Sequence, residues 1–259
     1  MIVARSVAEV RAALTDRRDG TVGLVPTMGA LHDGHRALLR AARGSCDTVV
    51  MSLFVNPTQF GDAADLNGYP RDEAADFVAA DEAEVDVVFA PTAAEMYPAG
   101  YQTWVEVTEL GAMLEGAFRP GHFRGVATVC LKLFTIVRPD LVFFGQKDAQ
   151  QVAVLRRMIA DLQLELELVA VPTVRDPDGL ASSSRNRRLA VEERRRALAF
   201  PRALATRDPK TARALLEAAG LEVDYVAVAP FDPPTLAGAI RIGSTRLIDN
   251  VPLDSEVPE

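Results

Sequence analysis

Two of the three histidines in the chain lie three residues apart, as His32 and His35, with Gly34 between them. They follow a short apolar run containing Val22 and Val25 and precede a segment with the apolar spacing of a helix. This pattern predicts a strand, a tight loop and a helix N-terminus. Backbone N–H groups at a helix N-terminus are unpaired and carry partial positive charge, which favours phosphate. One helical turn would place both imidazole rings beside the same ligand.

Two alternatives exist for this histidine pair. One ring could lie on the helix surface and the other in the core. A zinc site is also conceivable, because histidines at positions i and i+3 can share a metal. No cysteine, glutamate or third histidine lies nearby in the sequence to complete such a site. We therefore predict phosphate binding and assign no metal-ligating residues.

Side-chain amides follow the next predicted strand, residues 47–55. Asn56 and Gln59 stand in the loop after it. Ligands of open α/β sheets collect beyond the carboxyl ends of the strands, so both amides would face the same crevice as His32. Turn formation is the alternative for Asn56. Gln59 has no such role, and an uncharged amide can donate to a hydroxyl or carboxylate of a substrate.

Two further segments carry groups suited to an anion. Lys147 stands in the first turn of a predicted helix, where a cation is unfavourable for the helix dipole unless an anion lies in front of it. Ser182–Arg185 lies in the polar, turn-rich segment 172–186 and offers hydroxyl and guanidinium donors for a polyphosphate. A flexible linker is the alternative for that segment.

Two charged regions, the loop 116–125 and the acidic segment 71–82, each allow two interpretations. The loop 116–125, with Arg119 and His122, could serve an anion or begin a helix with solvent-facing arginine. The acidic helix predicted at 71–82 is expected to present a solvated face. An approach of Asp76 to a magnesium–phosphate cluster is the less favoured alternative there.

Strand and helix patterns alternate along most of the chain, which predicts an α/β fold with a doubly wound, mostly parallel sheet. The other expected strands are 85–90, 140–144, 164–171 and a half-exposed strand at 104–107, and the other expected helices begin after Ser6 and cover 126–137 and 150–162. We predict a larger, phosphate-binding domain at 1–174 and a smaller α+β domain at 175–259. The smaller domain is expected to contain a basic helix at 187–205, a helix at 212–219 and strands at 223–228, 239–242 and 245–249.

Composition excludes several classes of protein. The formal net charge of -8 argues against a broad nucleic-acid footprint, which needs clustered cations. No apolar stretch approaches the roughly 18 residues that span a bilayer, and the first residues lack the pattern of a signal peptide. Cys46 and Cys130 are far apart and outside any CxxC pattern. We therefore expect a protein of the reducing cytoplasm, with no membrane or nucleic-acid partner.

The common nucleotide and nucleophile motifs GxxxxGK[ST], GxGxxG and GxSxG are absent from the sequence. What remains is three phosphate-directed groups after three separate strands. Such a set can position a triphosphate for attack at phosphorus, where the protein mainly orients the reactants and neutralises charge.

Four blocks, in this order and spacing, resemble the pantothenate synthetase (pantoate–β-alanine ligase) family. They are Pro26 to His35 (PTMGALHDGH), Phe54 to Phe60 (FVNPTQF), Phe143 to Asp148 (FFGQKD) and Asp178 to Asn186 (DGLASSSRN). The HxGH motif alone is shared with other nucleotidyl-transferring enzymes. The resemblance covers residues 1 to about 190 and continues to Leu247–Asn250.

The resemblance implies a homodimer with a Rossmann-like domain and a C-terminal domain that closes over the site. It implies that ATP and Mg²⁺ are required. The carboxylate of pantoate would attack the α-phosphorus to give pantoyl adenylate and pyrophosphate, and the amine of β-alanine would then displace AMP. The part after Asn186 has 73 residues, which is shorter than the family's C-terminal domain is expected to be.

The resemblance also assigns residues. Catalytic roles fall on His32, His35, Lys147 and Arg185. Pantoate binding falls on Gln59 and Gln151, with Asn56 beside them. ATP binding falls on Met28, Gly29, Ala30, Leu31, His32, Asp33, Gly34, His35, Gly145, Gln146, Lys147, Asp148, Val174, Ser182, Ser183, Ser184 and Arg185. The alternatives are another HxGH-type nucleotidyltransferase and a non-enzymatic nucleotide-binding protein.

Overall fold

A computed structural model describes residues 1–253, apart from the side chains of Ala63 and Asp65. The described chain forms two compact units. The first comprises Met1–Gly145 and Gln150–Val171, and the second comprises Gln146–Ala149 and the chain from Pro172 onward. The short segment Gln146–Ala149 thus belongs to the second unit, whereas the sequence placed it within a domain of residues 1–174. Residues 254–259 of the predicted C-terminal domain lie outside the described residues.

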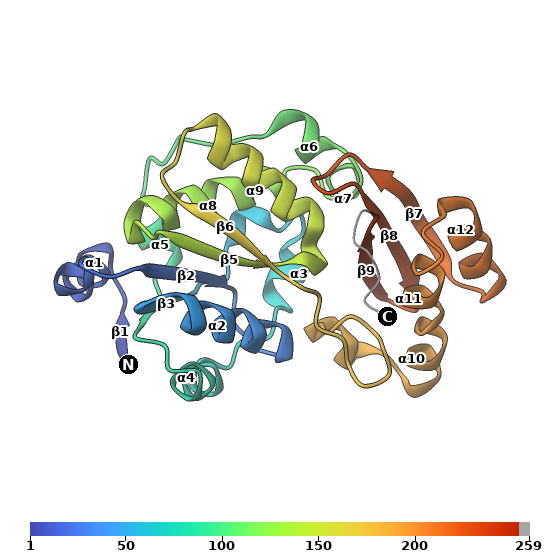
Figure 1. The fold of residues 1–259 in the computed structure, drawn as a ribbon, viewed down its shortest axis with the longest axis horizontal. Coiled ribbons are helices and arrows are strands. Elements are labelled where there is room, and N and C mark those ends of the chain that lie inside the picture. Colours follow the sequence, from blue (N-terminus) through green and yellow to red (C-terminus); the bar gives the residue numbers. More distant parts are fainter. Residues whose placement is uncertain (254–259) are drawn as a thin grey trace. The chain divides into compact units, whose positions relative to one another are not determined.

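The first unit is built on a parallel sheet. Within residues 1–253 this sheet has six strands in the order β1-β4-β3-β2-β5-β6 (Figure 1). The strands are β1 (Ile2–Ala4), β2 (Val22–Thr27), β3 (Thr48–Leu53), β4 (Val87–Phe89), β5 (Leu141–Gly145) and β6 (Glu167–Val171). Every neighbouring pair is parallel.

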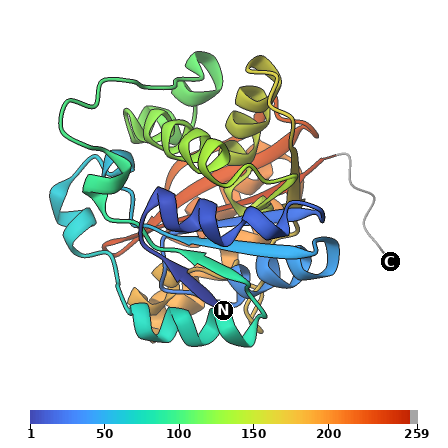
Figure 2. The ribbon, with the colours of Figure 1, turned by 90° about the vertical axis from the view of Figure 1, so that its left-hand side faces the viewer.

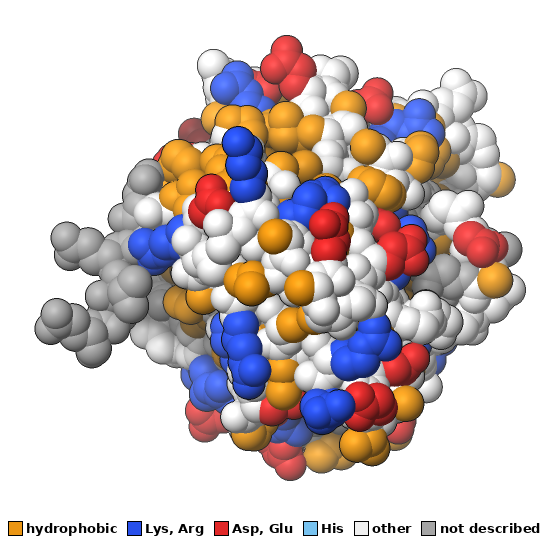
Figure 3. All heavy atoms as spheres, turned by 90° about the vertical axis from the view of Figure 1, so that its right-hand side faces the viewer, with side chains coloured by type: hydrophobic (Ala, Val, Ile, Leu, Met, Phe, Trp, Pro, Cys, Tyr) orange, Lys and Arg blue, Asp and Glu red, His pale blue; other side chains and the backbone are white. Residues whose placement is uncertain are grey.

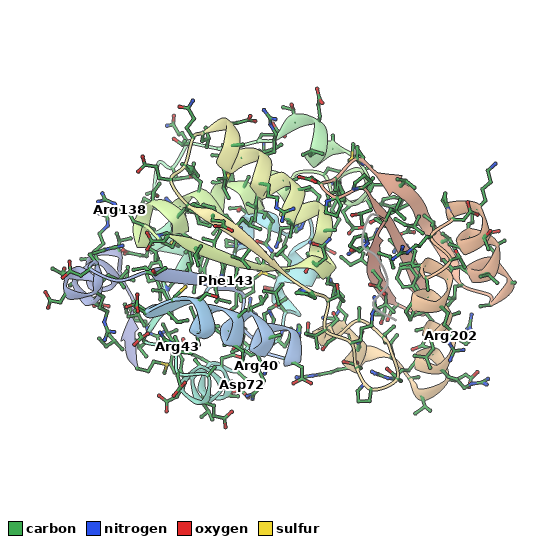
Figure 4. The ribbon with its side chains drawn as sticks, viewed as in Figure 1. Arg40, Arg43, Asp72, Arg138, Phe143 and Arg202 are labelled. Atoms are coloured by element: carbon green, nitrogen blue, oxygen red, sulfur yellow. The ribbon has the colours of Figure 1, made fainter. Side chains whose placement is uncertain are left out.

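Helices cover both faces of this sheet (Figures 1 and 2). One face packs on α1 (Val7–Ala13), α8 (His122–Val137) and α9 (Ala149–Asp161), and the other packs on α2 (Asp33–Ser45) and α4 (Glu73–Glu82). Successive strand residues point to opposite faces, so the strands must be apolar on both sides. Phe143, labelled in Figure 4, is fully buried on the α2 face, while its neighbour Phe144 packs on the other. The predicted doubly wound α/β fold is confirmed.

Two local predictions for the first unit differ from the structure. Residues 104–107 form no strand; the backbone N–H of Val105 donates instead to Thr128 Oγ1 of α8 at 3.0 Å. The alternating apolar residues Val105 and Val107, which predicted a strand, pack instead on the core that contains α8. Helix α8 begins at His122, earlier than the predicted 126. The remaining short helices are α3 (Ala63–Asn67), α5 (Ala93–Met96), α6 (Thr108–Ala112) and α7 (Glu115–Phe118).

The second unit is a small α+β structure. Its strands β7 (Glu222–Ala229), β8 (Thr235–Ile242) and β9 (Thr245–Pro252) form an antiparallel sheet, and its helices are α10 (Val191–Ala197), α11 (Ala199–Leu204) and α12 (Pro209–Ala218). Phe200, Leu216 and Ile240 are fully buried between the sheet and these helices. The predicted continuous helix 187–205 is wrong, because the chain forms a 3-10 helix at Ser184–Arg188 and then two separate helices.

The surface of the second unit carries charges of both signs. Figure 3 shows Lys and Arg side chains interspersed with Asp and Glu side chains on this face. Among the described residues, no helix has the length and apolar character required to cross a membrane.

Candidate active site

The position of β2 and β5 defines where a ligand is expected. These two strands are neighbours in the centre of the sheet. From β2 the chain continues to β3 on one side, and from β5 it continues to β6 on the other. Ligands of open α/β sheets bind beyond the carboxyl ends of strands at such a reversal of strand order. The His32–His35 motif follows β2, and the segment with Lys147 follows β5.

The two histidines cap the N-terminus of α2. The His32 ring accepts the backbone N–H of Gly34 at Nδ1 (3.1 Å), and the His35 ring accepts the backbone N–H of His32 at Nδ1 (3.3 Å). The ring centroids are 4.2 Å apart. Since Nδ1 of each ring is an acceptor, the proton of each neutral imidazole lies on Nε2. The motif thus fixes two adjacent Nε2–H donors at a helix N-terminus.

Asp76 of α4 holds the loop before these histidines. Its carboxylate accepts the backbone N–H groups of Ala30 (3.0 Å) and Leu31 (2.8 Å), and the residue is 3% exposed. Gly29 and Ala30 have positive φ angles of 85° and 52°. Successive N–H groups in such a conformation form an anion-binding concavity. Here the anion is the protein's own carboxylate.

One sequence prediction is corrected by this contact. The acidic helix was expected to be a solvated face, but Asp76 lies on its buried side with Ala79 and Ala80. The backbone N–H groups of Ala30 and Leu31 donate to Asp76, so these two donors hold the loop. The assignment of both residues to ATP binding stays a prediction. The buried spacing of Asp76, Ala79 and Ala80 is the signal that sequence reasoning missed.

We expect Asp76→Asn to disturb the loop while preserving the size of the side chain. One carboxylate oxygen becomes an NH₂ group facing a backbone N–H, and hydrogen bonds to charged groups contribute roughly 1.5–3 kcal/mol. The free energy of unfolding should fall by about 2 kcal/mol, and the KM for ATP should rise. Urea unfolding and steady-state kinetics measure the two effects. Asp81→Asn, at an exposed position of the same helix, is the control; equal behaviour of the two variants would contradict the assignment.

Asn56 organises the turn that carries Gln59. It is 1% exposed, and both ends of its amide have protein partners. Its Nδ2 donates to Gln59 Oε1 (3.1 Å) and to the Gly125 carbonyl (3.2 Å), and its Oδ1 accepts the hydroxyls of Tyr97 and Thr58 at 2.9 Å each. Burial raises the pKa of Tyr97 to about 12, so this phenol remains a donor at neutral pH. The geometry favours positioning of Gln59 over the direct substrate contact predicted for Asn56.

Gln59 is brought beside Met28 from a different loop. Its Nε2 lies 3.1 Å from Met28 Sδ, while its Oε1 accepts from Asn56. Thioether sulfur is a weak acceptor, and an amide NH₂ has two donors, so Gln59 retains donor capacity for a ligand. Met28 and Gln59, two predicted site residues 31 positions apart in the sequence, therefore contact each other in the first unit.

The start of α8 packs directly on this turn. A Cβ at Gly125 would lie 2.5 Å from the Thr58 carbonyl oxygen, so only glycine permits the approach. His122 is 8% exposed; its Nδ1 lies 2.9 Å from the Gln59 carbonyl oxygen and its Nε2 lies 3.0 Å from Arg119 NH1. The structure therefore uses His122 and Gly125 to hold the Gln59 turn, a role that neither alternative for the 116–125 segment included.

The adjacent residues Gln150 and Gln151 differ in environment. Gln150 is 6% exposed and ties α9 to the preceding loops: Nε2 donates to the carbonyls of Leu110 and Met113 at 2.7 Å each. Gln151, predicted to bind pantoate, is partly exposed in the first turn of α9. Of these two residues, Gln151 is therefore the one with exposed surface.

A second group of predicted residues lines one cavity within the second unit. Lys147, Ser183 and Arg185 lie in its wall, together with Asn186, Arg246 and Asp249. Ser182 is 6% exposed and its backbone N–H donates to the Val174 carbonyl (2.8 Å), which folds the segment 174–182 back on itself. Arg194 of α10 holds the same segment through ion pairs with Asp176 and Asp178 at 2.7 Å. The segment 172–186, for which a flexible linker was the alternative, thus has defined contacts and forms part of the cavity wall.

The predicted site residues fall into two groups, one in each unit. The first unit holds Met28 to His35, Gln59, Gly145 and Gln151, and the second holds Gln146, Lys147, Asp148, Val174 and Ser182–Arg185. Arg246, Asp249 and Asn186 were not assigned to the site, although Asn186 ends the fourth of the sequence blocks and Asp249 lies in the segment Leu247–Asn250. Among the described residues, no group of three or more His, Cys, Asp or Glu side chains could hold a metal ion.

A parallel doubly wound sheet, a histidine-capped helix after its central strand and a cationic cavity define the class: an α/β protein built to bind a phosphorylated ligand. A family model described as Pantoate-beta-alanine ligase matches residues 2–252, and the chain belongs to this family.

Individual relatives are similar over nearly their whole length. Pantothenate synthetase 1 of Bradyrhizobium diazoefficiens is 51% identical over 278 aligned positions, covering 98% of each chain. The crystal structure of pantothenate synthetase from Thermus thermophilus superposes with a TM-score of 0.91 at 44% identity, covering 97% of this chain and 99% of that one. Pantoate-beta-alanine ligase from Francisella tularensis, complexed with beta-gamma ATP and beta-alanine, gives a TM-score of 0.89 at 33% identity, covering 99% of each chain.

Proposed function

We propose that the chain joins pantoate to β-alanine at the expense of ATP, releasing AMP and pyrophosphate. The observation that carries this proposal is membership of the pantoate–β-alanine ligase family over residues 2–252. The Francisella relative was solved with an ATP derivative and β-alanine, which supports ATP and β-alanine as substrates here. The reaction forms a C–N bond, so the protein acts as an acid–amine ligase.

The reaction proceeds in two steps. A carboxylate oxygen of pantoate attacks the α-phosphorus of ATP, the bond to the bridging oxygen breaks, and pyrophosphate leaves. The neutral amine of β-alanine then attacks the acyl carbon of pantoyl adenylate, AMP leaves, and the amine proton passes to solvent. Both steps depend on holding the nucleophile in line with the bond that breaks.

The predicted residues divide this work. Nε2–H of His32 and His35 donates to phosphate oxygens at the N-terminus of α2, and His35 stabilises the charge on the leaving pyrophosphate. Lys147 and Arg185, which line one cavity of the second unit, supply cations for a triphosphate. The donor capacity of Gln59, beside Met28, and of the partly exposed Gln151 suits the carboxylate and hydroxyls of pantoate.

Mg²⁺ completes the proposal. Magnesium in nucleotide sites is commonly bound by one or two carboxylates and by substrate phosphates rather than by a protein cage. When bound to the triphosphate, the ion neutralises charge that would otherwise oppose attack by a carboxylate.

The proposal also covers assembly and location. We infer a homodimer in the cytoplasm, with small molecules as the substrates and no nucleic-acid or membrane partner. The negative net charge supports the last point, because phosphate backbones require clustered cations.

A burst of pyrophosphate tests the proposed function. ATP and pantoate, supplied without β-alanine, should release one equivalent of pyrophosphate per site, because adenylation precedes attack by the amine. Addition of β-alanine should then start steady turnover. Quenched-flow measurement of pyrophosphate gives both quantities.

Each alternative has its own result. A different HxGH nucleotidyltransferase would show no burst with pantoate, and a non-enzymatic nucleotide-binding protein would bind ATP without releasing pyrophosphate. A strict requirement for β-alanine before any pyrophosphate appears would overturn the two-step reaction.

A further inference from the structure

The short turn that carries Lys147 belongs to the second unit, although the chain on both sides of it belongs to the first. Asn250 of β9 contacts this turn directly. Its Nδ2 donates to the backbone carbonyls of Gln146 and Lys147, at 2.9 Å each. These residues are more than 100 positions away in the sequence. One side chain therefore attaches the Lys147 turn to the C-terminal sheet.

The orientation of this amide is determined by the turn. Asn250 is 4% exposed, and its Oδ1 has no hydrogen-bond partner among the described residues. An orphaned buried acceptor is costly. The reverse orientation would place Oδ1 against two carbonyl oxygens, which is worse because like dipoles repel. The side chain thus leaves its own acceptor unsatisfied while it donates twice to the turn.

Asp249, the residue before Asn250, contacts the segment that leads to Ser183 and Arg185 in the same cavity. Asp249 is 3% exposed and pairs with Arg175, whose NH1 lies 2.8 Å from Oδ2. Arg175 stands at the start of the segment that leads to Ser183 and Arg185. Two adjacent residues of β9 therefore hold the two segments that bring Lys147, Ser183 and Arg185 to one cavity.

We propose that Asn250 is a positioning residue for Lys147: by binding the Gln146 and Lys147 carbonyls, it presents the Lys147 ammonium to the triphosphate from the same body that carries Arg185. The proposal rests on the proposed function, in which Lys147 contacts ATP. Asn250 itself does not touch the substrate. Its effect on the reaction therefore has to pass through Lys147.

Asn250→Asp tests this directly, because it keeps the size of the side chain and replaces both N–H donors by an oxygen that repels the two carbonyls. Misplacement of a charged group by about 1 Å costs on the order of 100-fold in rate. We expect the single-turnover rate of pantoate-dependent pyrophosphate formation to fall roughly 10- to 100-fold, with a higher KM for ATP and an unchanged KM for pantoate.

A double-mutant cycle separates positioning from general destabilisation. In a Lys147→Ala background, Asn250→Asp should change the same rate by less than about twofold, because the group that Asn250 positions is already gone. The control is Ile240→Val, which removes a methyl group from the core of the same sheet without contacting the turn. Its adenylation rate should equal that of the parent.

Two results would overturn the proposal: an equal loss of rate in both backgrounds, or an Asn250→Asp rate within threefold of the parent. If Asn250→Asp does not fold, Asn250→Ser, which keeps a single donor, replaces it in the same cycle. The ATP dissociation constants of the parent, the two single variants and the double variant are also measured by calorimetry, which gives the same cycle for binding. A parent that binds ATP but forms no pyrophosphate with pantoate would contradict the proposed function alone, and the ATP cycle would still decide the role of Asn250.

Discussion

Replacing His35 by alanine is expected to lower kcat by roughly two to three orders of magnitude, with a smaller effect on ATP affinity. In the adenylation transition state, negative charge accumulates on the leaving pyrophosphate. The Nε2–H of His35 is fixed, because its Nδ1 accepts the His32 backbone N–H. A fixed donor stabilises that charge more than it stabilises bound ATP. Loss of one such donor typically costs 10²- to 10³-fold in rate.

Single-turnover pyrophosphate formation and equilibrium ATP binding measure the two effects separately. His35→Asn retains a donor and should be less damaging than alanine. Arg40→Ala, at an exposed position of the same helix and labelled in Figure 4, is the matched control and should leave the rate unchanged. An alanine variant within about threefold of the parent, under ~1 kcal/mol in the barrier, would remove His35 from the chemistry.

Replacing Lys147 by alanine is expected to lower kcat/KM for ATP by about 100-fold. Lys147 and Arg185 lie in the wall of one cavity, and neither forms an ion pair with a carboxylate within residues 1–253. Lys147 and Arg185 therefore contribute positive charge that the triphosphate of the proposed substrate would neutralise. Because charge on the phosphates grows at the leaving group, part of the loss should appear in kcat.

Lys147→Arg keeps the charge on a longer, planar group and should recover part of the rate. Lys210→Ala, an exposed lysine of the same unit, is the control for a change in net charge. Raised salt should lower ATP affinity less in Lys147→Ala than in the parent, since one charge contact is missing. Equal kcat/KM for Lys147→Ala and Lys210→Ala would contradict the assignment.

The sequence by itself determined the class of fold and the place of the histidine pair. Apolar strands such as 47–55 alternate with helical patterns, and in a parallel sheet buried on both faces that alternation has few other solutions. The capping role of His32 and His35 is also local, because a helix N-terminus leaves N–H groups that only nearby acceptors can satisfy. These features depend on residues close together in the chain.

The roles of Asp76, Asn56 and the 116–125 segment required the tertiary structure. Asp76 and Asp81 lie on one helix, and only the packing of that helix decides which carboxylate meets the Ala30 and Leu31 N–H groups. Asn56 was predicted to contact the substrate, but in the structure its amide forms hydrogen bonds with Tyr97, Thr58, Gln59 and Gly125. Local sequence gives the hydrogen-bonding capacity of a side chain, whereas its partners are decided by contacts across the fold.

Only the tertiary structure decided that Lys147 belongs with the C-terminal unit. In the sequence it lies directly after β5 and reads as part of the first domain. Two hydrogen bonds from Asn250, on the last strand, place it with Ser183 and Arg185 instead. A contact across more than 100 residues follows from how the strands of the second unit pair and pack. Neither the composition nor the spacing around Lys147 contains that information.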